Sequence, residues 1–159
     1  MEFSNQNLKA VTVLIRAADA VHDAIKRDVA GYGLNATEFS VLELLYHQGR
    51  QPIQAIGKRV LIASSSITYV VDKLEHKGYV EREACKEDRR VTYALLTDDG
   101  QELMKRIFPE HERQMDKVFA GLGQEEVVEL IEKLKKVGYE AQDSIEQKDR
   151  ILKDKERYA

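Results

Sequence analysis

Two groups of side chains near the middle of the chain have the types and spacing to bind nucleic acid. The first is a run of hydroxyls with one lysine on a predicted helix: Ser64, Ser65, Ser66, Thr68, Tyr69 and Lys73. Short hydroxyls at a helix N-terminus suit phosphates and the edges of bases in a major groove, and the backbone N–H groups there favour a phosphate. The alternative interpretation is an ordinary helix cap followed by a solvated face.

The second group is the charged turn formed by Asp88, Arg89 and Arg90. An arginine gains energy in a narrow minor groove, where negative potential is concentrated, and a carboxylate two residues earlier can orient it. A solvated turn is the alternative for this group. Three further basic residues are candidates for backbone phosphates, with an ordinary surface role as the alternative: Lys58, Arg59 and Lys77.

Cys85 is the only cysteine of the sequence, which excludes an internal disulfide and a zinc site built on several cysteines. A sensing thiol needs exposure and a lowered pKa. Lys86 and Arg82 could supply positive charge nearby, whereas Glu83 and Glu87 oppose them. A regulatory thiol at Cys85 is therefore a hypothesis to test.

Composition limits the remaining function classes. The chain has 159 residues, of which 43% are hydrophobic and 33% charged, so it is expected to form a buried core. We find no apolar run of about 20 residues, no secretory signal, no metal-binding histidine spacing and no catalytic constellation. We therefore expect a cytoplasmic protein that is not an enzyme, binds no cofactor, metal or membrane, and acts by binding.

Charge is unevenly distributed along the chain. The formal net charge is −3, yet nine basic and six acidic residues between Arg50 and Thr92 give that segment +3 and leave −6 for the remainder. A basic centre between acidic flanks is consistent with a protein that binds DNA through its middle segment.

Hydrophobic periodicity predicts the elements that must position these residues. Asn35 and Glu38 have the spacing of a capping box, Thr97 is a predicted cap, and Pro109 is expected to kink or split the helix it lies in. The expected elements are helices over 5–30, 35–48, 53–60, 64–77, 97–122 and 124–141, and a β-hairpin over 79–96, with 142–159 either extending the last helix or fraying.

This order of elements predicts a mainly α fold with a small β-wing, a winged helix-turn-helix. The helices at the two ends of the chain are too long and too apolar for one small lobe to cover, so they are expected to pack against a partner.

Three motifs resemble the MarR family of bacterial transcriptional regulators, and the similarity extends over residues 8–140. Within the family, the segment 34–75 is similar to the MhqR-type repressors, which respond to quinones and hydroquinones. The motifs are SSSITYVVDKLEHKGYVERE at 64–83, EDRR at 87–90 and LTDDG at 96–100.

The resemblance implies a homodimer that binds pseudo-palindromic DNA. It implies a single domain over 1–141 followed by a charged tail over 142–159. Within that domain, the winged helix-turn-helix would span 34–97, and dimerisation helices would span 5–30 and 98–141. Asp88 would orient Arg90 for insertion into the minor groove, with Arg89 near a phosphate.

The resemblance also implies a repressor that a small phenolic or electrophilic effector releases from DNA. Its pocket would lie between the dimerisation helices and the winged-helix lobe, where Phe39, Tyr46 and Phe108 are candidates, with plain core packing as the alternative. Two other hypotheses remain open: a redox switch acting through Cys85, and a winged helix that binds proteins instead of DNA.

Overall fold

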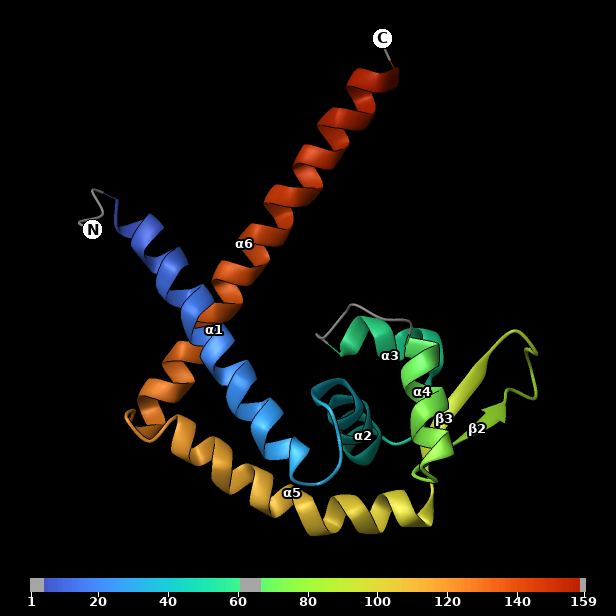
Figure 1. The fold of residues 1–159 in the computed structure, drawn as a ribbon. Coiled ribbons are helices and arrows are strands. Elements are labelled where there is room, and N and C mark those ends of the chain that lie inside the picture. Colours follow the sequence, from blue (N-terminus) through green and yellow to red (C-terminus); the bar gives the residue numbers. More distant parts are fainter. Residues whose placement is uncertain (1–4, 61–66, 158–159) are drawn as a thin grey trace. The chain divides into compact units, whose positions relative to one another are not determined.

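The computed structural model describes residues 5–60 and 67–157, and they form a mostly helical fold with a small antiparallel sheet (Figure 1). The mainly α fold class with a β-wing is confirmed. The elements are α1 (Gln6–Ala30), α2 (Ala36–Gln48), β1 (Gln51–Pro52), α3 (Ile53–Arg59), α4 (Ile67–His76), β2 (Val80–Ala84), β3 (Thr92–Leu96), α5 (Asp98–Val118) and α6 (Gln124–Arg157).

The chain forms two compact units, Met1–Val118 and Phe119–Ala159. The first unit contains α1 to α5 and the sheet. Its core is built from the apolar faces of α2 to α5 and the strands, and the largest fully buried side chains include Phe39, Leu42, Leu45, Ile56, Leu74, Met104 and Ile107.

The capping box at the start of α2 is present as expected. The Asn35 side-chain oxygen accepts a hydrogen bond from the Glu38 backbone N–H at 2.8 Å, and the Asn35 N–H donates to Glu38 Oε2 at 2.9 Å. Both groups would otherwise be unpaired donors at a helix N-terminus, so the reciprocal bonds fix where α2 begins.

The sheet has three strands in the order β1-β3-β2, all antiparallel. The hairpin of β2 and β3 was expected, and Arg82 faces Ala94 across it. The strand β1 was not expected, because a two-residue strand that includes Pro52 has no periodicity. Proline is tolerated there because β1 is an edge strand, where its missing N–H breaks no ladder.

Thr97 and Gly100 join the hairpin to α5 and explain the LTDDG motif. The Thr97 hydroxyl donates to Gly78 O at 2.6 Å and accepts from Gly100 N–H at 3.1 Å. The Thr97 N–H also donates to Tyr79 O at 3.1 Å. A Cβ at Gly100 would lie 2.1 Å from that same carbonyl oxygen, so only glycine fits.

Pro109 does not split its helix, because α5 continues through it from Asp98 to Val118. Figure 1 shows that α5 changes direction near its middle. Pro109 and Lys105 are both exposed, so water can bind the carbonyl that the missing proline N–H leaves unpaired.

The base of α1 is attached to α5 by a nearly buried polar pair. Asp28 Oδ2 lies 2.6 Å from His111 Nδ1, and the His111 ring packs on Phe39 with ring centroids 4.4 Å apart. This contact anchors the C-terminal end of α1 to the winged-helix lobe.

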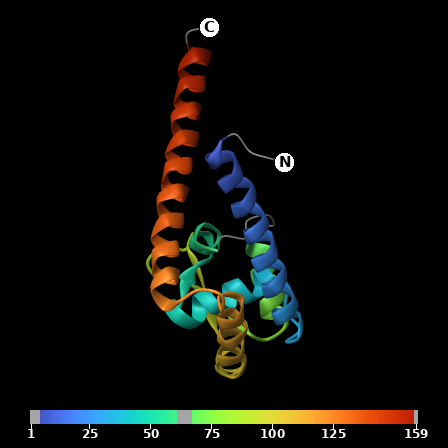
Figure 2. The same cartoon turned by 90° about the vertical axis from the view of Figure 1, so that its left-hand side faces the viewer.

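The second unit consists mainly of α6, which Figure 2 shows as one continuous helix. It continues through the charged stretch after residue 141 to Arg157, so the stretch extends the helix instead of fraying.

We predict that Gly100→Ala lowers the free energy of unfolding by about 2–4 kcal/mol, because the new methyl group meets the Tyr79 carbonyl. Urea denaturation followed by circular dichroism measures this. Gly138→Ala is the matched control: a Cβ there meets nothing within 4 Å, and alanine favours the helix by roughly 1 kcal/mol. Equal stabilities for the two variants would contradict the Gly100 argument.

Candidate nucleic-acid interface

The outer face of α4 presents three of the expected DNA-binding residues to solvent. Val70, Val71 and Leu74 are buried on its inner face. Because a helix separates its two faces, this burial places the polar side chains of the element outward. The residues exposed on the outer face are Thr68, Tyr69 and Lys73, while Ser64, Ser65 and Ser66 lie outside the described residues.

Two of these side chains contact each other. Lys73 Nζ lies 5.2 Å from the centroid of the Tyr69 ring, within range of a cation–π interaction. The contact orders a long flexible lysine on an exposed surface. The pair therefore presents a positive charge and a phenol hydroxyl together.

The turn between β2 and β3 holds a pre-oriented arginine. Arg90 Nε and Nη2 donate to the two carboxylate oxygens of Asp88 at 3.1 and 3.3 Å, and the Arg90 backbone N–H donates to Asp88 Oδ1 at 3.0 Å. The Arg90 side chain is still 90% exposed. The Arg90 guanidinium keeps the pKa of the Asp88 carboxyl below its ordinary value. Arg89, beside it, is also exposed.

Arg82 is a functional candidate that sequence reasoning did not assign to this interface. Its guanidinium forms ion pairs with Asp72 and Glu75 on α4, and it donates to Thr68 O at 3.5 Å. It therefore connects the wing strand β2 to α4 and offsets part of the negative charge of two acids on the helix that carries the candidate DNA contacts. The sequence signal that could have revealed these ion pairs is the spacing of Asp72 and Glu75, which are three residues apart on the helix that precedes the strand of Arg82.

The three candidate phosphate contacts differ in their surroundings. Lys58 is exposed near the end of α3. Arg59 Nη1 donates to the side-chain oxygens of Gln48 at 2.6 Å and Gln51 at 3.0 Å. The Lys77 ammonium donates hydrogen bonds to the Glu38 carboxylate and to a backbone carbonyl.

Comparison with known proteins agrees with this architecture. The MarR family profile matches residues 34–92. The HTH-type transcriptional regulator MhqR of Bacillus subtilis is 48% identical over 138 residues, covering 87% of this chain and 95% of that protein. The chain belongs to the MarR family of transcriptional regulators, which bind DNA.

Two further matches extend the comparison. The uncharacterized HTH-type transcriptional regulator YkoM of Bacillus subtilis is 45% identical, covering 82% of this chain and 84% of that protein. The crystal structure of Sco3205, a MarR family transcriptional regulator from Streptomyces coelicolor in complex with DNA, superposes with a TM-score of 0.77. It is 26% identical and covers 87% of this chain and 89% of that one.

Cys85 of this MarR-family chain lies at the end of β2 and is partly exposed. Backbone N–H groups of Asp88 and Glu87 donate to its sulfur and hold the pKa of the thiol below its ordinary value, with a smaller contribution from the Tyr93 hydroxyl. The Asp88 charge acts in the opposite direction. The lowered pKa therefore comes from backbone hydrogen bonds, not from the basic neighbours that the sequence suggested.

The three candidate effector residues pack into or against the core. Phe39 is 1% exposed, and the Tyr46 and Phe108 rings lie with centroids 5.8 Å apart. They line neither of two surface pockets in this unit: one of about 430 Å³ along α2 and α3, and one of about 790 Å³ along α1 and α5. Their assignment to an effector pocket stays a prediction.

No helix in the described part of the chain is long and apolar enough to cross a bilayer. Within residues 5–60 and 67–157 there is also no cluster of three or more metal-binding side chains.

We predict that Cys85 is alkylated by iodoacetamide with half-maximal rate at a lower pH than N-acetylcysteine, because only the thiolate attacks and its pKa is lowered. Mass spectrometry of samples quenched at set times measures the rate of alkylation at this thiol, the only one in the sequence. Tyr93→Phe should move the midpoint upward. Glu87→Ala is the matched control, since residue 87 acts through its backbone N–H. A midpoint equal to that of the free thiol would contradict the prediction.

Proposed function

We propose that this chain is a homodimeric repressor that binds a pseudo-palindromic operator and releases it on binding a small aromatic or electrophilic compound. The observation that carries the proposal is the exposed Arg90 guanidinium held by Asp88 on the wing, whose strand β2 is joined to α4 through Arg82. α4 would read the major groove and the wing the adjacent minor groove.

The Asp88–Arg90 geometry supports insertion into DNA because the arginine is ordered before binding. A free arginine side chain loses about 2 kcal/mol of rotamer entropy when it is fixed. Here two charge-assisted hydrogen bonds already restrict it, and the guanidinium remains accessible. Less of the binding energy is then lost to ordering the side chain.

Apolar side chains on α1 support the dimer. Exposed aliphatic residues are unusual in this number on one helix of a monomer. The exposed residues are Leu8, Val11, Val13, Leu14 and Ile15. In the second unit, α6 carries a similar set: Val128, Ile131, Leu134, Val137 and Ile145.

A two-fold dimer would place two copies of α4 on half-sites about one helical turn apart, which accounts for a pseudo-palindromic operator. An effector can release DNA only if it binds the DNA-competent and incompetent arrangements unequally. An effector of quinone or phenol type is what the resemblance of residues 34–75 to the MhqR-type repressors implies, and MhqR of Bacillus subtilis is 48% identical to this chain. The pocket along α2 and α3 offers His47, Ser40 and Arg59 to a ligand oxygen.

A second candidate mechanism is a redox switch through Cys85, which its lowered thiol pKa and position on the wing loop favour. Oxidation beside Asp88 and Arg90 would disturb the wing. A Cys85→Ser variant that keeps its response to the inducing compound excludes this mechanism, and one that loses the response supports it.

The deciding experiment is selection of genomic DNA fragments by the purified protein at two salt concentrations. An enriched inverted repeat whose binding weakens at higher salt supports the proposal. No enrichment at low salt would overturn it and favour a winged helix that binds protein partners.

We predict that Arg90→Ala raises the dissociation constant for the selected operator about 10- to 100-fold, because the wing loses its minor-groove contact. Asp88→Asn should have a smaller effect, since only the orientation of Arg90 is weakened. Fluorescence anisotropy measures both. Arg113→Ala, an exposed arginine on α5 paired with Glu110, is the matched control and should bind like the unaltered protein. Unchanged affinity of the Arg90 variant would refute its role.

We predict that the double substitution Val11→Glu and Ile15→Glu dissociates the dimer into monomers, because two charges enter an apolar interface. Light scattering after size exclusion reports the mass. Lys58→Glu, an exposed position on α3 outside the expected dimerisation helices, is the control. If the unaltered protein is already monomeric at micromolar concentration, the proposed dimer interface on α1 is excluded.

A further inference from the structure

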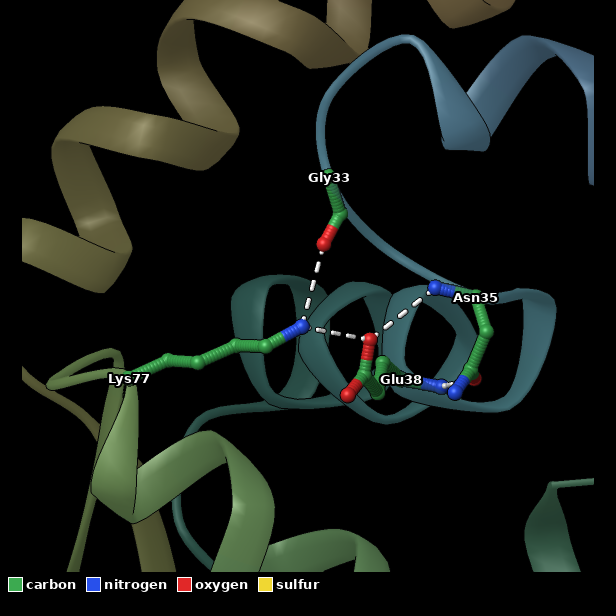
Figure 3. Close-up of polar contacts among 4 residues, drawn as sticks. All are labelled: Gly33, Asn35, Glu38 and Lys77. Carbon is green, nitrogen blue, oxygen red and sulfur yellow. Dashed lines mark hydrogen bonds and ion pairs between the residues drawn. The ribbon is translucent and has the colours of Figure 1, made fainter.

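Lys77, at the C-terminal end of α4, reaches into the junction between α1 and α2 (Figure 3). Its ammonium donates to Glu38 Oε2 at 2.9 Å and to the backbone carbonyl of Gly33 at 3.0 Å. The Glu38 side chain is only 3% exposed and the Lys77 side chain 34%. The Asn35 N–H donates to the same carboxylate oxygen, so the lysine shares the capping box of α2.

The lysine leaves α4 from a fixed point. The Lys77 N–H bonds to Lys73 O, and the Tyr79 N–H bonds back to Leu74 O across Gly78, which has a φ of +80°. This is a glycine-capped helix end, in which the left-handed residue closes the last turn. The stem of Lys77 therefore starts from a rigid position instead of a fraying terminus.

The acceptors are equally fixed. Gly33 has a φ of +74° and follows the last turn of α1, where the Leu34 N–H bonds to Val29 O. Glu38 is held by its own bond to Asn35. The ammonium thus joins three ends of helices: the C-terminus of α4, the C-terminus of α1 and the N-terminus of α2.

We propose that Lys77 is a positioning residue that fixes the orientation of α4 relative to α1, and so sets the separation of the two α4 helices in the dimer. The proposal rests on the proposed function, in which α1 belongs to the dimer interface and α4 reads DNA. It replaces the expectation of a phosphate contact, because two acceptors already bind the Lys77 ammonium and one of them is a buried carboxylate.

The two roles differ in measurable ways. A lysine on a phosphate contributes about 0.9 to the slope of log affinity against log salt concentration, and its loss weakens all operators alike. A lysine that orients α4 leaves that slope unchanged. Loss of such a lysine lets the two α4 helices of the dimer adopt several separations. The protein then discriminates less well between operators with different half-site spacing.

The experiment compares four variants on the selected operator and on two others whose spacer is one base pair shorter or longer. Lys77→Met removes the ammonium and keeps the stem. The double variant Glu38→Gln with Lys77→Met removes both charges, so no buried carboxylate is left unpaired if the single variant folds poorly. Lys58→Met tests a candidate phosphate contact, and Lys105→Met is the control for an exposed lysine in an ion pair on α5.

Anisotropy titrations at four salt concentrations, with melting temperatures for each variant, give the outcome. We expect both Lys77 variants to bind the selected operator roughly tenfold more weakly, with the unaltered salt slope and a reduced preference for its spacing. Lys105→Met should change none of these quantities.

Three results would overturn the proposal. They are a salt slope reduced by about 0.9 in both Lys77 variants, an unchanged spacing preference, and an unchanged affinity accompanied only by a lower melting temperature. If the unaltered protein binds no inverted repeat, the proposed function fails and this inference with it. Specific binding by the unaltered protein with any of the three results refutes the positioning role alone.

Discussion

The start of α2 is the point on which the arrangement of the winged-helix lobe depends. The Glu38 carboxylate is almost fully buried, and a buried charge is stable only if it is paired and hydrogen-bonded. It receives one bond from the helix cap and one from Lys77, 39 positions later in the chain. Local capping and long-range helix packing therefore depend on the same oxygen atom, and neither can shift without exposing or unpairing it.

The wing is organised by a second set of charges. Arg82 forms ion pairs with Asp72 and Glu75 and so connects β2 to α4, while Asp88 orders Arg90 in the turn. The two arginines have different surroundings: the Arg82 guanidinium is paired with acids of α4, whereas the Arg90 side chain is exposed. One guanidinium beside two carboxylates leaves this group with a net negative charge, so Arg82 offsets only part of the negative charge on α4.

Much of the fold is encoded locally and was predicted from sequence. The Asn35–Glu38 capping box depends on three consecutive peptide units, and the apolar spacing of α4 follows from 3.6 residues per turn. The LTDDG motif predicted a helix start at Thr97, although the reason for its glycine became clear only from the nearby Tyr79 carbonyl. The sequence did not predict strand β1, because two residues are too few to show an alternation of polar and apolar side chains.

The sequence by itself predicted most of the elements and the candidates for contact with DNA, because these depend on spacing along the chain, and its motifs carried the resemblance to the MarR family. Only the tertiary structure decided which charges are free. Lys77 and Arg82 resemble any other basic residue of the central segment, but the structure binds them to carboxylates on other elements, 39 residues away for Lys77 and 7 and 10 residues away for Arg82. Arg90 instead pairs with a neighbour and stays exposed. Ion pairs between elements form only when packing brings those elements together, and the sequence alone does not give the distance between them.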